Sequence, residues 1–196
     1  RLEENTGGAG GFFAGVELAS KLKFDYLWMM DDDGRPDSSC LEKLLDCRYT
    51  EKIKGPLIYS NENELHTEHN IDGKITNLLE EVSKKERLNL VHPFNGTLIA
   101  AEVFEKIGNI KKELFIWGDE QDFRLRWISA GYNEVTITSA KYYHPKNRLK
   151  LIKKIGYLKI PDIPENRKYI YYRNQAYIDI KNRGVLDSIA SLSRWL

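Results

Sequence analysis

The run Asp31-Asp32-Asp33 directly follows the apolar run Tyr26-Leu27-Trp28-Met29-Met30. Three neighbouring carboxylates repel one another and destabilise a fold unless a cation offsets their charge. In extended backbone Asp31 and Asp33 point to the same side, so one metal ion could contact both. Oxygen ligands of this kind favour Mg²⁺ or Mn²⁺, with a diphosphate filling further positions. The alternative is an acidic turn exposed to water.

His144 is a further metal-ligand type of residue, and it comes soon after a predicted strand at Glu134–Ile137. A lone histidine is more often a packed or hydrogen-bonded residue than a ligand. Only the presence of the acidic run favours a metal-binding role for His144. His66, His69 and His92 have no such support in the sequence.

Two acids, Asp119 and Glu120, follow Trp117-Gly118 and open a predicted helix at Asp119–Ala130. Because the helix dipole favours negative charge at this end, capping alone could explain both residues. The functional alternative is a carboxylate that takes a proton from an acceptor hydroxyl.

The segment Asn5–Gly11 holds four glycines and is predicted to be a turn-rich loop. It lacks the Gly-Lys-Ser/Thr end of a P-loop, and Phe13 stands where a dinucleotide-binding motif needs its third glycine. Such a loop can still present backbone N–H groups to a pyrophosphate. A tight turn with close helix–sheet packing is the alternative.

These residues require a frame of strands and helices to position them. The apolar run before the acids is typical of a buried central strand, and the prediction is an α/β fold. The apolar patterns predict helices at 12–23, 37–47, 102–107 and 119–130, strands at 26–30, 53–59, 91–100, 114–117 and 134–137, and a polar hairpin-like insertion at 61–90.

The composition limits the alternatives. The 196 residues carry 30 Lys+Arg against 29 Asp+Glu, a net charge of +1, which argues against a basic nucleic-acid binder. No stretch approaches the roughly 18 apolar residues of a membrane span. Cys40 and Cys47 lie too far apart on one helix for a disulfide, which suits a reducing cytosol.

Two features concern the organisation of the chain. In open sheets a glycine-rich turn follows a strand, and none precedes this one, so we expect a missing N-terminal βαβ portion. The sequence becomes basic and aromatic from Lys141 onward. We therefore predict a catalytic domain at residues 1–145 and a mostly helical C-terminal segment at 146–196.

The order of these motifs resembles family 2 glycosyltransferases of the GT-A fold, in their rhamnosyl- and galactofuranosyltransferase-like branch. The resemblance covers essentially the whole chain and includes the late run Tyr171-Tyr172-Arg173-Asn174. It implies a Rossmann-like, mixed, mostly parallel sheet flanked by helices.

The resemblance also implies residue roles. Asp31 and Asp33 would be the metal-binding ends of the DxD motif, with His144 as an additional ligand. Asp32 would lie beside the nucleotide ribose or the donor sugar. Glu120 matches the general base, and Asp119 would help to position the acceptor. The nucleotide sugar would also contact the glycine segment, at Asn5, Gly7, Gly8, Gly10 and Gly11.

The expected function is inverting transfer of galactofuranose or rhamnose from a UDP- or dTDP-linked donor. The acceptor would be a hydroxyl of a glycan or of a polyprenyl-diphosphate-linked glycan, in cell-surface polysaccharide synthesis. The expected location is cytoplasmic, peripheral at the inner face of the plasma membrane. The alternatives are a sugar-phosphate nucleotidyltransferase and a non-catalytic module that binds a glycan or a lipid carrier.

The stretch from Lys146 to Lys159 carries six basic residues and no acid. One explanation is a solvated helix packed on the domain. The functional alternative, at about 1 kcal/mol for each basic residue near an anionic surface, is reversible, salt-sensitive binding to membranes. We expect the protein to cosediment with anionic vesicles at low salt and to be released as salt is added. Negligible binding to anionic and neutral vesicles alike would contradict this prediction.

Overall fold

The computed structural model describes residues 3–46, 48–146, 151–155, 158–161 and 163–184. The chain divides into two compact units, and helices α1 (Gly7–Ser20) and α5 (Asp119–Ser129) contribute residues to both. One unit consists of Arg1–Gly15, Ile110–Leu125 and Arg148–Leu196, and the other, which holds the large sheet, consists of Val16–Asn109 and Arg126–Asn147. The functional boundary near residue 146 stays a prediction.

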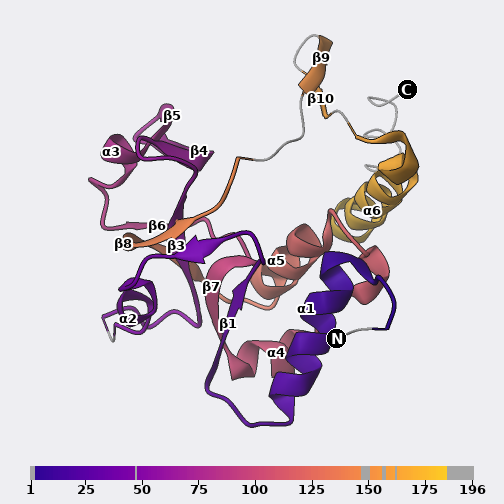
Figure 1. The fold of residues 1–196 in the computed structure, drawn as a ribbon, viewed down its shortest axis with the longest axis horizontal. Coiled ribbons are helices and arrows are strands. Elements are labelled where there is room, and N and C mark those ends of the chain that lie inside the picture. Colours follow the sequence, from indigo (N-terminus) through magenta and orange to yellow (C-terminus); the bar gives the residue numbers. More distant parts are fainter. Residues whose placement is uncertain (1–2, 47, 147–150, 156–157, 162, 185–196) are drawn as a thin grey trace. The chain divides into compact units, whose positions relative to one another are not determined.

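The centre of the large sheet has the strand order β1, β7, β3 and β8 (Figure 1). These strands are Tyr26–Met30, Asn95–Ala100, Ile53–Tyr59 and Glu134–Tyr143, respectively. The α/β class is confirmed, but the expected mostly parallel sheet is wrong for the described strands. Among the described strands, only β3 and β8 pair in parallel. Strand β7 lies between β1 and β3 and runs antiparallel to both.

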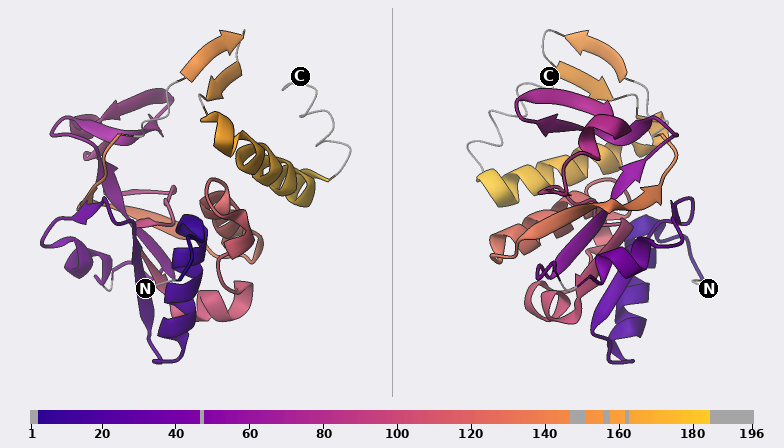
Figure 2. Two further views of the ribbon diagram at one scale, coloured as in Figure 1. Left: turned by 45° about the vertical axis from the view of Figure 1, so that its right-hand side comes forward. Right: turned by 90° about the vertical axis from the view of Figure 1, so that its left-hand side faces the viewer.

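The predicted insertion at residues 61–90 is confirmed as a hairpin. It consists of β4 (Glu64–Ile71) and β5 (Lys74–Leu78), followed by helix α3 (Leu79–Val82) and the short strand β6 (Arg87–Leu88), which pairs with β8. Figure 2 shows this hairpin as a small lobe at one end of β3. A separate apolar cluster supports it, formed by the buried side chains of Leu57, Leu65 and Val82.

Helix α2 (Cys40–Leu44) packs against the sheet through a second apolar cluster. The cluster joins Cys40 and Leu44 to buried residues of β7 and β8, among them Leu98 and Ile137. Cys40 is a free, buried thiol, and burial raises its pKa to about 12. Cys47 lies outside the described residues, and the absence of a disulfide between the two cysteines stays a prediction.

Helix α4 (Ala101–Ile107) follows β7 as predicted.

Three expectations are corrected for the unit that does not contain the large sheet. Helix α1 begins at Gly7, so most of the predicted glycine loop is helical. The apolar residues 114–117 form the end of a short 3-10 helix, η1 (Lys112–Leu114), and an irregular loop instead of a strand. The basic stretch contains a hairpin of β9 (Leu151–Ile155) and β10 (Leu158–Pro161), followed by helix α6 (Glu165–Arg183).

The basic residues behind the membrane prediction fall largely outside the described side chains. Lys146 is exposed and forms an ion pair with Glu64 of the hairpin. Arg148 and Lys150 lie outside the described residues. None of the helices in the described part of the chain has the length and hydropathy that a membrane span needs.

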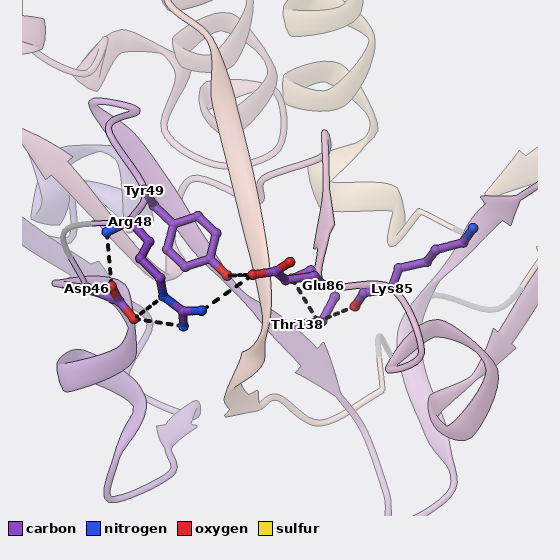
Figure 3. A network of polar contacts seen from close by, with 6 residues as sticks. All are labelled: Asp46, Arg48, Tyr49, Lys85, Glu86 and Thr138. Carbon is purple, nitrogen blue, oxygen red and sulfur yellow. Dashed lines mark hydrogen bonds and ion pairs between the residues drawn. The ribbon is translucent and has the colours of Figure 1, made fainter.

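A polar network joins the segment after α2 to the segment before β6 (Figure 3). The Tyr49 hydroxyl donates to the Glu86 carboxylate at 3.2 Å, and Arg48 pairs with Asp46 at 2.9 Å. On the other side, the Thr138 hydroxyl of β8 contacts the backbone carbonyls of Lys85 and Glu86, the latter at 3.0 Å. Thr138 thereby fixes the chain as it enters β6.

We expect Thr138→Val to lower the free energy of unfolding by about 1–3 kcal/mol, because the buried hydroxyl shares its one proton between the Lys85 and Glu86 carbonyls and valine has no donor. Equilibrium denaturant unfolding measures the change. The control is Thr50→Val, since Thr50 is exposed and the same substitution there should change stability by less than about 0.5 kcal/mol. Equal losses in the two variants would contradict the assigned role of Thr138.

Candidate functional site

The register of β8 brings the acidic run to His144. Strand β2 (Arg35–Pro36) directly follows the run and pairs antiparallel with β8, with Arg35 opposite Tyr143. The next residues on the two strands are Gly34 and His144, so Asp33 and His144 become neighbours. Two backbone bonds fix the ends: the Asp31 N–H donates to the Phe94 carbonyl at 2.9 Å, and the His144 N–H donates to the Tyr59 carbonyl at 3.0 Å.

The imidazole of His144 presents one nitrogen to both carboxylates. Its Nε2 lies 3.3 Å from Asp33 Oδ1 and 4.0 Å from Asp31 Oδ2. Its Nδ1 lies 2.8 Å from the Pro145 carbonyl oxygen, which can only accept, so Nδ1 carries the proton. In the neutral ring this hydrogen bond leaves the lone pair on Nε2, which is how metal-binding histidines are commonly oriented.

Asp31, Asp33 and His144 each offer one ligand atom, and these three atoms lie within 4.8 Å of one another. Two carboxylate oxygens and one imidazole nitrogen are donors that Mn²⁺ and Mg²⁺ accept. The residues therefore fit the expected divalent cation, and the metal triad predicted from the sequence is brought together. Asp32 is exposed and lies outside the triad.

Tyr142 lies beneath the acidic turn and was not anticipated from the sequence. Its side chain is fully buried, and its hydroxyl has no hydrogen-bond partner among the described residues. A Cβ at Gly34 would lie 1.9 Å from that hydroxyl, so the turn approaches the ring only because residue 34 has no side chain. Burial, followed by the charges of Asp31 and Asp33, raises the pKa of Tyr142 to about 12. The phenol therefore stays neutral.

His66 is a second residue that the sequence analysis left without a role. It belongs to β4, and its ring meets the His144 ring edge-on, with centroids 4.7 Å apart. Burial, together with the nearby His144, lowers the pKa of His66. His69 lies elsewhere on the strand, where the Thr67 hydroxyl joins it to His92 at 3.4 and 3.3 Å. Only the pairing of β4 with β3 could have revealed the contact with His144.

Asp119 and Glu120 open helix α5 as predicted, but they differ in accessibility. Asp119 is buried, with 6% of its surface exposed, and Glu120 is half-buried. Burial raises the pKa of Asp119, and the backbone N–H groups of Asp119 and Glu120 oppose this shift. Glu120 is therefore the carboxylate with better access to a ligand.

Asp122 is a buried residue of α5 that forms ion pairs within the protein. Its carboxylate is 1% exposed and pairs with Lys181 of α6 at 3.1 Å and with Lys111 at 3.5 Å. Two cations offset the cost of burying this charge. Asp122 thus attaches the start of α5 to α6.

The glycine segment contacts the chain just before α5. The Ala9 N–H donates to the Phe115 carbonyl at 3.1 Å, and a Cβ at Gly7 would lie 2.1 Å from that oxygen. The Asn5 side chain accepts from the Gly7 N–H at 3.0 Å. The N–H groups of Gly7 and Ala9 are thus engaged within the protein. Contact of the segment with a nucleotide sugar stays a prediction.

Comparison with known proteins gives a consistent picture of the fold. No family model matches the chain. In a solved structure of GalNAc-T7 with UDP, GalNAc and Mn²⁺, the matching region covers 75% of this chain and 32% of that one, with a TM-score of 0.53 and 14% identity. The fold is that of a GT-A glycosyltransferase. The GT-A likeness confirms the fold expected from the motifs.

Two galactofuranosyltransferases named GlfT1 are similar in sequence. The protein of Mycolicibacterium smegmatis is 29% identical over 189 residues, a match that covers 89% of this chain and 62% of the relative. The protein of Mycobacterium tuberculosis is 28% identical over 186 residues, and the match covers 89% and 61%. This chain spans about three fifths of the length of these relatives. The likeness to these relatives agrees with the resemblance drawn from the motifs.

We expect Asp33→Asn to weaken Mn²⁺ binding more than about tenfold, because the triad loses one of its two anionic ligands. Titration calorimetry with Mn²⁺ alone measures the affinity. The control is Asp32→Asn, which removes the same charge from an exposed neighbour outside the triad. Equal affinities for the two variants would show that general negative charge, and not the triad, attracts the ion.

Proposed function

We propose that the chain acts in metal-dependent, inverting transfer of a sugar from a nucleoside-diphosphate donor to a hydroxyl of a glycan or polyprenyl-diphosphate-linked glycan. The observation that supports this most strongly is the triad of Asp31, Asp33 and His144 on a GT-A fold. Galactofuranose and rhamnose, linked to UDP or dTDP, are the proposed donors. Galactofuranose is the first donor to test, because the relatives are named galactofuranosyltransferases.

Asp31, Asp33 and His144 would hold Mg²⁺ or Mn²⁺, and Asp32 would face the ribose or the donor sugar. A bound divalent ion supplies positive charge that stabilises the leaving nucleoside diphosphate. The protonated Nδ1 of His144 keeps Nε2 available as a ligand. The buried Tyr142 stays neutral beneath the turn, and so adds no third negative charge to the two carboxylates.

Glu120 would accept the proton of the acceptor hydroxyl as its oxygen bonds to the anomeric carbon. The bond between that carbon and the diphosphate oxygen breaks, and its electron pair leaves with the diphosphate. Attack from the opposite face inverts the anomeric centre. The greater access of Glu120 supports this role, and the buried Asp119 would help to position the acceptor.

The proposed place of action is the cytoplasmic face of the plasma membrane, where polyprenyl-diphosphate-linked acceptors would be reached by peripheral attachment. The support is the basic stretch at Lys146–Lys159 in the sequence.

A donor screen on the full-length protein tests the proposal. UDP- and dTDP-linked sugars are supplied with a glycan acceptor and Mn²⁺, and both released nucleoside diphosphate and the glycosylated product are measured. Release of pyrophosphate from a nucleoside triphosphate and a sugar phosphate would instead select a nucleotidyltransferase. Binding of acceptor without turnover of any donor would select a non-catalytic module.

We expect Glu120→Gln to lower transfer by more than about a hundredfold while donor affinity stays within about twofold, because the amide keeps the shape but cannot accept the proton. The control is Glu113→Gln, an exposed residue of η1, which should retain activity. If Glu120→Gln remains active and Asp119→Asn does not, the base is Asp119.

A further inference from the structure

The loop that leads into α5 has an unusual backbone. Three of its residues have positive φ angles: Phe115 at 65°, Trp117 at 59° and Gly118 at 110°. Phenylalanine and tryptophan rarely adopt this region, because their Cβ atoms crowd the neighbouring carbonyl. Such a conformation persists only where the surrounding structure holds it. The loop needs an external support, and the next residues are Asp119 and Glu120.

Asn174 of α6 provides that support. Its side chain is completely buried, at 0% exposure. Its Nδ2 lies within hydrogen-bond distance of the backbone carbonyls of Leu114 at 2.7 Å, Ile116 at 2.9 Å and Trp117 at 2.7 Å, so its two protons are shared among three acceptors. One amide group thus contacts three carbonyls within four consecutive residues, and the loop stays in one unit with α6.

Arg173 fixes which way the Asn174 amide points. The Arg173 guanidinium donates to Asn174 Oδ1 from Nε at 3.0 Å and from Nη2 at 2.8 Å. A guanidinium has only donors, so the oxygen must face Arg173 and the NH₂ must face the loop. Arg173 Nη2 also donates to the Glu113 carbonyl at 2.7 Å.

Gly118 completes the fit between the loop and the amide. A Cβ at Gly118 would lie 3.2 Å from Asn174 Cβ and 2.9 Å from Ile178 Cδ1. The positive φ of Gly118 and the close approach of α6 both require glycine at this position.

We propose that Asn174 is a positioning residue that holds the loop 115–118 and thereby sets the orientation of Glu120 for proton transfer. The inference rests on the proposed function, in which Glu120 is the base. The side chain of Asn174 acts through the backbone, since its acceptors are the carbonyl of Leu114, directly before the loop, and those of Ile116 and Trp117 within it. The catalytic carboxylate at the start of α5 then depends on a residue of α6.

The test compares Asn174→Asp with Asn182→Asp in the full-length protein. Aspartate keeps the shape of asparagine but replaces the NH₂ that donates to the loop. Asn182 is the matched control, because it lies on the same helix and donates to the carbonyl of Ile178 within that helix. The measurements are amide hydrogen exchange of residues 114–122, kcat for transfer, and affinity for UDP with Mn²⁺.

We expect faster exchange in residues 114–122 of Asn174→Asp and a kcat lowered about 10- to 100-fold, since a small misplacement of a reacting group has effects of this size. UDP affinity should change less than about twofold, because the metal triad belongs to the other unit. Asn182→Asp should match the wild type in all three measurements. A purely structural role for Asn174 would lower stability without the selective loss of kcat.

Wild-type exchange and kcat in a folded Asn174→Asp protein would overturn the proposal. If Asn174→Asp fails to fold, Arg173→Ala takes its place, since Arg173 is exposed and its removal frees the amide to turn. Faster loop exchange with a reduced kcat then supports the proposal, and unchanged values reject it. If the wild type transfers no sugar, the proposed function fails, while the exchange experiment still decides whether Asn174 holds the loop.

Discussion

The pairing of β2 with β8 is the interaction on which the metal triad depends. The acidic run and His144 are more than a hundred residues apart in the sequence, and this short antiparallel contact makes them neighbours. Strand β8 can do this because its last residues, Lys141–Tyr143, also pair in parallel with Leu57–Tyr59 of β3 after a register shift at Pro56/Leu57, which fixes their position. A slip of one residue would turn His144 to the opposite face of the sheet. The sheet therefore sets the chemistry of the site through register.

The groups around the acidic turn differ in charge from those around the buried carboxylate of Asp122. Two carboxylates face one imidazole nitrogen, while the buried group beneath them is an uncharged phenol. At Asp122 the arrangement differs, because its buried carboxylate forms ion pairs with Lys111 and Lys181. One acidic cluster stays open to a cation from outside, and the other carboxylate is neutralised within the protein. The difference separates a site for a ligand from a structural ion pair.

The sequence predicts those features that depend on local pattern. The strands at Tyr26–Met30 and Ile53–Tyr59 occur at the predicted residues. The expected buried central position of Tyr26–Met30 is wrong for the described strands, since only Met29 of β1 is buried and β1 lies at the end of the strand order, paired with β7. An apolar run therefore locates a strand but does not fix its place in the sheet. The metal triad follows from ligand type, since few residues can bind a divalent cation. Strand direction has no local pattern, which is why the antiparallel β7 between β1 and β3 was missed. Helix α1 begins at Gly7 despite the low helix propensity of glycine, and the Phe115 carbonyl leaves no room for a Cβ at that residue. The roles of His66 and Asn174 depend on long-range contacts that no spacing reveals.

The close approach of Gly34 to Tyr142 has a consequence for how the sequence can vary during evolution. The missing side chain at residue 34 and the large ring at residue 142 occupy one shared volume. Neither position can grow without a loss at the other, so the two should change together among homologous sequences. A side chain at residue 34 should be accompanied by a smaller residue at 142, and a pair that keeps glycine and an aromatic ring preserves the turn. Covariation between these positions would thus be a record of steric complementarity beneath the acidic turn, at residues that bind no ligand themselves.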